Sequence, residues 1–221
     1  MSSIAFPHAV TVTRDGARPY AEMAERLAAA VLLIALSPVI LATALLILIL
    51  SGRCPWIAHR RVGRYGTALW VPKLRTMWER RDKLTRFSRF FSVEYIDDDN
   101  GPALKAPEDE RVGSRFARFC RRHSLDELPQ LLLVLTGRMS LVGPRPVTLG
   151  ELSLIYGPDA GRVLTAKPGL SGLWQVSGRN RLTLSERRVL DLQSAHNHSW
   201  RLYLTILLRT IPEILSGRNT W

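Results

Sequence analysis

The clearest hydrophobic pattern in the chain is an apolar run over residues 27–50 that contains no charged side chain. A straight helix of this length would measure about 36 Å at ~1.5 Å per residue, enough to cross the hydrocarbon core of a bilayer. The run is interrupted by Ser37-Pro38 near its middle. Because Pro38 has no N–H to donate to the carbonyl of Ile34, we expect a kink there, with the Ser37 hydroxyl helping to satisfy the freed group.

Basic residues lie on both sides of the apolar run: Arg14, Arg18 and Arg26 before it, and Arg53, Arg60, Arg61 and Arg64 after it. A helix that spans a membrane normally shows more positive charge at one end than at the other. Two basic ends favour a segment that enters the membrane and returns to the same face. A kinked spanning helix stays open on the pattern alone, because proline is common in membrane spans.

The first residues of the chain have no hydrophobic period and contain Pro7, Gly16 and Pro19. We interpret residues 1–21 as a flexible leader. They do not resemble a secretory signal, because the apolar run starts too late and is too long. We expect three parts: this leader, a membrane helix over residues 22–52, and a membrane-associated domain over residues 53–221.

The remaining pattern predicts a small α+β domain that is mostly helical. Residues 56–79 read as short strands joined by turns, and residues 167–181 as loop and turn. Residues 200–215 read as a helix that lies on the membrane or packs on the core. Helical spacing of apolar positions recurs in several further segments: residues 78–95 (amphipathic), 111–122, 128–135, 151–165 and 183–195, the last with Thr183 or Ser185 as its N-cap.

The charge and the cysteines limit the classes of protein. The net charge of +12 over 221 residues suits anionic lipid surfaces, nucleic acid or phosphorylated small molecules, and does not choose among them. The chain has no recognisable nucleic-acid module. Its two cysteines, Cys54 and Cys120, form no metal-binding pattern and indicate reduced thiols on the cytosolic side. We expect Cys120 to be buried in its helix.

The strongest candidate for chemistry is the acidic pair Asp126-Glu127. Neighbouring helical residues point about 100° apart, so the two carboxylates converge only at a helix start or a turn, and Pro129 favours a helix start here. Capping by Ser124 and Asp126 is an open interpretation. An aspartate can also attack phosphorus and form an acyl phosphate, provided that cations hold the phosphates. Such cations precede the pair: Arg115, Arg118, Arg121 and Arg122.

Two further segments offer groups that bind phosphate or nucleotide. Pro144-Arg145-Pro146 is a rigid turn that presents one guanidinium, which suits bidentate binding of a phosphate, although a plain structural turn stays open. Residues 168–180 combine three glycines with Trp174, Gln175 and Arg179, and can bring backbone N–H groups and a flat ring against a nucleotide. The aspartates at 97–99 read as a solvated turn rather than a metal site.

Together these motifs resemble the bacterial sugar transferase family, the monotopic phosphoglycosyl transferases that begin exopolysaccharide and glycan assembly. The resemblance covers nearly all of the chain from about residue 22 onwards. Several motifs in the same order carry it: Ser37-Pro38, Lys73-Leu74-Arg75-Thr76-Met77, Ser124 to Gln130, Met139 to Pro146, and Pro168 to Arg179.

The resemblance implies transfer of a sugar-1-phosphate from a UDP-sugar to undecaprenyl phosphate, with release of UMP. Asp126 would form a covalent phosphosugar intermediate, and Glu127 would act as acid or base or help to place Mg2+, with Asp126 as a metal ligand. Ser37-Pro38 would make the membrane segment re-entrant, at the cytosolic face of a bacterial inner membrane. The implied substrate-binding residues are Lys73, Arg75, Arg121, Arg145, Gln175 and Arg179.

The resemblance also bears on donor and partners. The C-terminal pattern is similar to the hexose-transferring, exopolysaccharide-type branch, which suggests UDP-glucose or UDP-galactose. An anionic bilayer and downstream glycosyltransferases are the expected partners, and a homodimer stays open. Membrane-plane amphipathic helices would correspond to residues 78–91 and 200–215. Leu133 departs from the family, which usually has Asn there. A non-catalytic membrane-tethered scaffold of the same fold is the alternative.

Overall fold

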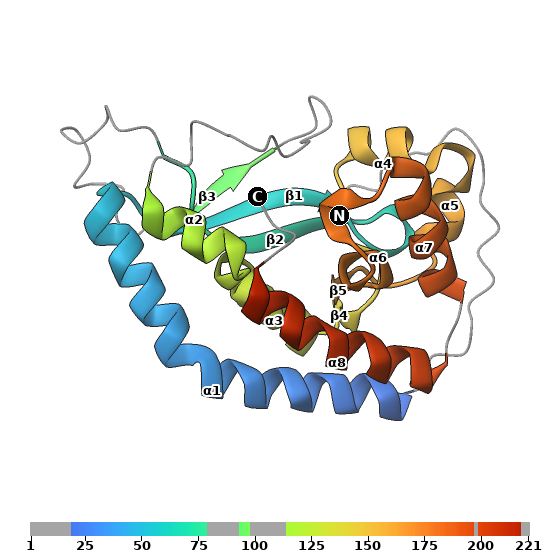
Figure 1. The fold of residues 1–221 in the computed structure, drawn as a ribbon, viewed down its shortest axis with the longest axis horizontal. Helices are drawn as coiled ribbons and strands as arrows, with labels where there is room; N and C mark the ends of the chain where they lie inside the picture. Colours follow the sequence, from blue (N-terminus) through green and yellow to red (C-terminus); the bar gives the residue numbers. More distant parts are fainter. Residues whose placement is uncertain (1–18, 79–92, 98–113, 197–198, 218–221) are drawn as a thin grey trace.

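The computed structural model describes residues 19–78, 93–97, 114–196 and 199–217. Within them the chain has the predicted α+β fold, which is mostly helical. Figure 1 shows a long N-terminal helix, α1 (Pro19–Ser51), along two sides of a smaller mixed domain. The C-terminal helix, α8 (Trp200–Ser216), lies beside the first half of α1.

The apolar run forms one helix that bends near its middle, the part that contains Pro38 (Figure 1). The Ser37 hydroxyl donates a hydrogen bond of 2.8 Å to the carbonyl of Ile34, so the expected satisfaction of this freed carbonyl is confirmed. By length and composition, residues 20–51 are the one helix among the described residues that could cross a membrane. Both a kinked span and a re-entrant segment fit this geometry.

A three-stranded sheet follows α1. Strand β1 (Trp56–Val62) pairs antiparallel with β2 (Ala68–Leu74) and parallel with β3 (Glu94–Ile96), in the order β2-β1-β3. Strands are thus confirmed where the sequence predicts them. The turn between β1 and β2 contains the short 3-10 helix η1 (Arg64–Gly66). Most of the amphipathic helix predicted over residues 78–95 lies outside the described residues, and its last two residues belong to β3 instead.

The second half of the domain is built around a two-stranded parallel sheet, β4 (Ser140–Val142) and β5 (Gly169–Ser171). The short helix α3 (Leu131–Leu135) precedes β4. Helices α4 (Leu149–Tyr156) and α5 (Ala160–Val163), with the 3-10 helix η4 (Gly157–Asp159) between them, connect the two strands. After β5 come α6 (Leu173–Val176), the 3-10 helix η5 (Arg179–Arg181) and α7 (Leu184–His196).

Three predicted segments differ from the observed elements. The helix predicted over residues 151–165 is divided at Gly157-Pro158, because Gly157 has a positive φ of 48° and Pro158 follows it. The loop predicted over residues 167–181 contains β5 and α6. The helix predicted over residues 128–135 is α-helical only from Leu131, and residues 125–130 form a 3-10 helix. The helix predicted over residues 111–122 is confirmed in its described part, Arg115–Arg122, where the Ser114 hydroxyl accepts hydrogen bonds from two backbone N–H groups. The Thr183 cap of α7 is confirmed, since its hydroxyl accepts from the Glu186 N–H.

The main core joins α1 to the domain. Ala29 of α1 is fully buried against Leu131, Leu133 and Met139, with Leu207 of α8 packed on the same cluster. Leu133, the departure from the family pattern, is therefore a core side chain. Along α8, Ile206 is buried whereas one stripe of apolar side chains is exposed: Trp200, Leu204, Leu208, Ile211 and Leu215. The packing role predicted for this helix is confirmed, and its exposed stripe is the part available to a membrane.

Candidate active site

The acidic pair lies in a tight turn. After α2 (Arg115–Arg122), Ser124 takes the left-handed conformation with φ 54°, and the 3-10 helix η3 (Leu125–Gln130) follows at once. The Ser124 side chain makes no capping hydrogen bond to η3, so the capping interpretation is wrong for this serine. A non-glycine residue in this conformation costs on the order of 1–3 kcal/mol, and such strain concentrates at functional sites. The turn therefore favours function over simple capping.

Glu127 is the centre of an ion-pair cluster. Its Oε1 accepts from Lys73 Nζ at 3.0 Å and from Arg145 Nη2 at 2.7 Å, while Arg145 Nη1 lies 3.4 Å from Oε2. The residue is 9% exposed. The charge of Glu127 is the largest cause that raises the pKa of Arg145 above its ordinary value, and burial opposes it. Removing one member of so buried a cluster costs about 3–5 kcal/mol.

Each member of the cluster comes from a different element. Lys73 lies on β2, on the same face as Leu69 and Val71, because side chains alternate along a strand. Glu127 comes from η3, which packs against β2. Arg145 comes from the turn after β4. Lys73 and Arg145, which lie 54 and 18 positions from Glu127 along the chain, thus bind the same carboxylate.

Arg179 is a third cation in the electrostatic environment of the Glu127 carboxylate. It has a positive φ of 49° at the start of η5. Burial lowers the pKa of its guanidinium, while the charge of Glu127 raises it and that of Arg145 lowers it again. These effects place Arg179 in the electrostatic environment of Glu127. Lys73 and Arg145 thus contact one carboxylate whose charge also reaches Arg179, and these three cations offer positive charge suited to phosphate.

Asp126 is partly exposed, in contrast to its buried neighbour. Its charge contributes to the raised pKa of Arg145, so Asp126 lies near the same cluster. It also lies close to Cys120, which is fully buried as predicted. Burial, and secondly the charge of Asp126, raise the pKa of the Cys120 thiol to about 12. A thiol with this pKa is neutral at pH 7, so Cys120 does not supply a thiolate nucleophile.

Arg121 lies in the last turn of α2, five residues before Asp126. Its Nε is buried and has no hydrogen-bond partner among the described residues. A buried guanidinium donor without an acceptor is costly, and an anionic ligand would supply one. The arrangement supports the substrate-binding role that the sequence predicts for Arg121.

Arg75 bonds to residues outside the Glu127 cluster. It is 5% exposed, and its Nε donates to the carbonyl of Cys54 while its Nη2 pairs with Glu94 at 2.7 Å. These bonds join the connection between α1 and β1 to strand β3. The structure therefore gives Arg75 a part in holding these elements together, and its contact with substrate stays a prediction.

Gln175 and Trp174 are both buried in α6. Gln175 Nε2 donates to the carbonyl of Leu170 at 3.3 Å, so the side chain joins α6 to strand β5. Its Oε1 and the Trp174 Nε1 have no hydrogen-bond partner among the described residues. The flat ring expected to meet a nucleotide instead carries the guanidinium of Arg187 at 4.5 Å from its centroid.

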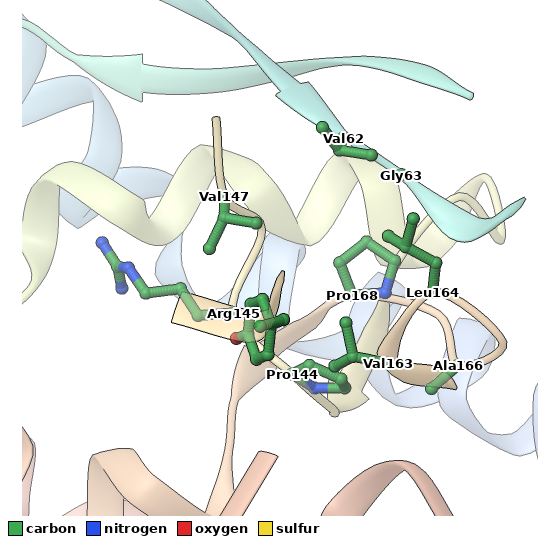
Figure 2. A pocket seen from close by; sticks show the side chains of 10 residues that line it. Val62, Gly63, Pro144, Arg145, Val147, Val163, Leu164, Ala166 and Pro168 are labelled. Carbon is green, nitrogen blue, oxygen red and sulfur yellow. The ribbon is translucent and has the colours of Figure 1, made fainter. Parts of the chain in front are cut away.

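The Pro144-Arg145-Pro146 turn is held from behind. Gly143 N–H donates to the Ser171 carbonyl, and Gly169 N–H donates to the Pro144 carbonyl, each at 2.8 Å. Figure 2 shows the small, mostly apolar pocket behind this turn, with the Arg145 guanidinium extending away from it. The pocket holds about 20 Å³, roughly the space for one water molecule. It is therefore a support for Arg145 and not a substrate site.

A second buried polar cluster was not predicted from the sequence. The Tyr156 hydroxyl donates to Asp191 Oδ2 at 2.6 Å, and Arg187 Nε lies 3.6 Å from the same oxygen. Asp191 is fully buried. Burial raises the pKa of its carboxyl to about 6 against the charges of Arg187 and, more weakly, Arg145. A lone aspartate at a helical position gives no signal of this kind, because its partners lie on other elements or a full turn away.

This pKa predicts a pH dependence of stability. The unfolded chain binds the Asp191 proton with the ordinary pKa of 3.8 and the folded chain with a pKa of about 6. The charged carboxylate thus destabilises the fold by about 3 kcal/mol at pH 7, and the penalty disappears as the pH falls from 6 to 4. We expect the thermal midpoint of the wild type in detergent to rise relative to that of Asp191→Asn as the pH falls over this range. A constant difference between the two proteins would contradict the raised pKa.

The described residues contain no group of three or more His, Cys, Asp or Glu side chains arranged to hold a metal ion. A Mg2+ ion commonly keeps several waters and takes only one or two carboxylates together with the phosphates of its substrate. Asp126 fits this kind of donor set, whereas Glu127 already accepts from two cations. The residues are compatible with a Mg2+ that arrives with a diphosphate.

Comparison with known proteins gives several related sequences. The chain is 35% identical to the "Exopolysaccharide production protein ExoY" of Rhizobium meliloti over 223 residues, which cover 99% of this chain and 97% of that one. It is 34% identical to the "UDP-glucose:undecaprenyl-phosphate glucose-1-phosphate transferase" of Caulobacter vibrioides, over 88% of this chain and 69% of that one. It is 40% identical to the "Undecaprenyl-phosphate galactose phosphotransferase" of Salmonella typhimurium, over 71% of this chain but only 32% of that larger protein.

The family description "Bacterial sugar transferase" matches residues 17–217, which include α1, the acidic pair and both loops that carry arginines to it. The match therefore covers every element of the site described above, and the first of these relatives aligns over nearly its whole length. The chain belongs to the bacterial sugar transferase family and is a phosphoglycosyl transferase.

Proposed function

We propose that this protein transfers a hexose-1-phosphate from a UDP-sugar to undecaprenyl phosphate, releasing UMP and forming the undecaprenyl-diphosphate sugar. The observation that carries the proposal is the binding of Lys73 and Arg145 to Glu127, within the electrostatic reach of Arg179 and next in sequence to the partly exposed Asp126. Two relatives are named for transfer to undecaprenyl phosphate, one for glucose-1-phosphate and one for galactose. This would be the first membrane step of exopolysaccharide or glycan assembly.

In the first half-reaction, a carboxylate oxygen of Asp126 attacks the sugar-bearing phosphorus of the donor. The bond between this phosphorus and the bridging oxygen of the diphosphate breaks, and the electron pair leaves with UMP. An aspartyl phosphosugar remains on the protein. Arg145, Lys73 and Arg179 hold the phosphate oxygens, and the buried Glu127 keeps the first two in position.

In the second half-reaction, a phosphate oxygen of undecaprenyl phosphate attacks the same phosphorus. The acyl–phosphate bond breaks and the Asp126 carboxylate is regenerated. One compact set of cations thus serves two anionic substrates in turn. Bound Mg2+ would neutralise phosphate oxygens, with Asp126 as its protein ligand.

The membrane arrangement follows from the substrates. The acceptor stays in the bilayer, so the site must lie at the headgroup level, on the cytosolic side of the inner membrane where UDP-sugars are made available. A re-entrant helix over residues 22–52 would hold it there, with residues 53–221 as the cytosolic domain and residues 1–21 as a leader. The exposed apolar stripe of α8 supports contact with the membrane surface. Basic residues on both sides of α1 would meet anionic lipids.

The experiment that tests the proposed reaction measures UMP release by the full-length protein in nanodiscs. The substrates are undecaprenyl phosphate and a panel of UDP-sugars that includes UDP-glucose and UDP-galactose. We expect release with a hexose donor, loss of release in excess EDTA, and recovery when Mg2+ is added back. Release that continues in EDTA would reject the metal requirement. Folded protein that is inactive with every donor would favour the non-catalytic scaffold.

The re-entrant geometry predicts that both ends of α1 lie on one face of the membrane. In a cysteine-less background, single cysteines at positions 23 and 53 should react with an impermeant maleimide only when the cytosolic face is accessible. Pro38→Ala restores a backbone hydrogen bond and favours a straight helix. We expect this variant to place part of the molecules with position 23 on the opposite face. Labelling of position 23 from outside in the unchanged helix would show a kinked span instead.

A further inference from the structure

A large cavity lies between the first half of α1, strand β4 and α8, on the two helices that Figure 1 shows side by side. Its volume is about 770 Å³, within the roughly 300–1,000 Å³ of sites that hold small molecules. Most of its lining is apolar. Small side chains on α1, Ala24 and Ala28, leave the space that Leu204 and Leu207 of α8 face from the other side.

The cavity borders surfaces suited to lipid. Leu204 belongs to the exposed apolar stripe of α8 and is also part of the cavity lining. On α1, Leu27 and Val31 are 64% and 66% exposed next to Ala28. Since both walls continue into exposed apolar surface, a chain lying among membrane lipids can enter between them.

A polar clamp keeps the two helices apart at a fixed distance. Glu25 Oε1 accepts from the Ser140 hydroxyl and from the Tyr203 hydroxyl, each at 2.5 Å, and from the Leu141 N–H at 3.3 Å. One carboxylate thus joins α1, β4 and α8. Three hydrogen bonds to one carboxylate oxygen hold the walls of the cavity in place, so it does not depend on a ligand to form.

The charges lining the cavity suit an uncharged occupant. Glu22 pairs with Lys167 at 2.8 Å, and the remaining charged lining residues are Glu25 and Arg64. Two acids and two bases leave no excess of positive charge for a phosphate. The cations in excess lie instead at Glu127. The cavity lining includes Gly143, two residues before Arg145 in the turn that reaches Glu127.

We propose that this cavity binds the isoprenoid chain of the lipid-phosphate acceptor, so that the chain lies between α1 and α8 and its phosphate reaches the Arg145 cluster. The proposal rests on the transferase reaction proposed above. Continuity with the Pro144-Arg145-Pro146 turn favours the acceptor over a bulk phospholipid. The α1–α8 cavity would thereby select long chains, while the cation cluster would select the phosphate.

Filling the cavity tests the proposal. Ala24→Trp and Leu204→Trp each add a large ring to its lining. Leu154→Trp adds the same ring to an exposed position on α4, which does not line the cavity, and is the matched control. We expect both cavity variants to raise the KM for undecaprenyl phosphate about tenfold or more, equivalent to roughly 1.4 kcal/mol of lost binding. The KM for a two-isoprene phosphate should stay unchanged, as should both values in Leu154→Trp.

The burst of UMP formed without acceptor reports folding and the first half-reaction, and we expect the cavity variants to retain it. Equal KM increases for long and short acceptors would overturn the proposal. So would a KM for undecaprenyl phosphate that does not change in either cavity variant.

Crosslinking separates this proposal from the reaction on which it rests, because it needs no turnover. A photoactivatable undecaprenyl phosphate should label residues 24–28 and 203–207, and unlabelled undecaprenyl phosphate should compete. Competition by phosphatidylglycerol alone would assign the cavity to a membrane lipid and overturn the acceptor assignment. Labelled cavity residues in a protein that releases no UMP would reject the proposed reaction but not the chain site.

Discussion

Asp126→Asn is expected to abolish both UMP release and the covalent phosphosugar adduct. Asparagine cannot form the acyl phosphate, and loss of a nucleophile typically lowers kcat by about 10,000-fold or more. The side chain keeps its size, so the turn around Ser124 should fold normally. The measurement is the UMP burst in the absence of acceptor, together with the intact mass of the protein after reaction with the UDP-hexose.

Glu127→Gln is the matched control, because it also exchanges one carboxylate for an amide. Glu127 is buried and accepts from Lys73 and Arg145, so its position suits holding cations rather than attacking phosphorus. We expect slower turnover, with the covalent adduct still detectable. An adduct in Asp126→Asn and none in Glu127→Gln would reverse the two roles. Full activity in Asp126→Asn would reject the aspartyl intermediate.

The parts of the fold that the sequence predicts well are those fixed by local pattern. The uncharged run became α1, and Ser37 bonds to the carbonyl that Pro38 leaves free, since both effects depend on neighbouring residues alone. The strands around β1 and β2 and the cap at Thr183 have the same local origin. Helix limits were less predictable where a single residue decides them, as at Gly157.

The sequence predicts which residue types make up the site, but not which of their side chains pair with one another. Arginines, a lysine and two acids could be named as candidates, yet no local pattern shows that Lys73 and Arg145 share one oxygen of Glu127. No local pattern shows that Arg75 would bond to both Cys54 and Glu94. Such pairs form because distant elements pack on each other. The Asp191 cluster and the cavity beside α8 arise in the same way, from packing and not from spacing along the chain.

The geometry of the β4–β5 pair explains why glycines are needed beside the site. A Cβ on Gly169 would lie 2.1 Å from the Gly143 nitrogen and 2.5 Å from the Ser171 carbonyl oxygen. Both are backbone atoms in a hydrogen-bonded pair, so neither can move aside without breaking the sheet. The same pair positions the Pro144-Arg145-Pro146 turn. A methyl group at this position would therefore disturb the fold and the Arg145 cluster together.

Gly169→Ala should consequently lose at least about 3 kcal/mol of stability, the upper range for forcing extra atoms into a packed region. For a chain of this size that loss lowers the thermal midpoint by roughly 10 °C, and we expect UMP release to be lost with it. Gly157→Ala is the control. It has open space around the new Cβ, and its φ of 48° with ψ of −119° makes the cost one of backbone strain alone, on the order of 1–3 kcal/mol, with activity retained. If Gly169→Ala were as stable and active as Gly157→Ala, the close backbone approach of β4 and β5 would be wrong. The placement of Arg145 that depends on it would then fail as well.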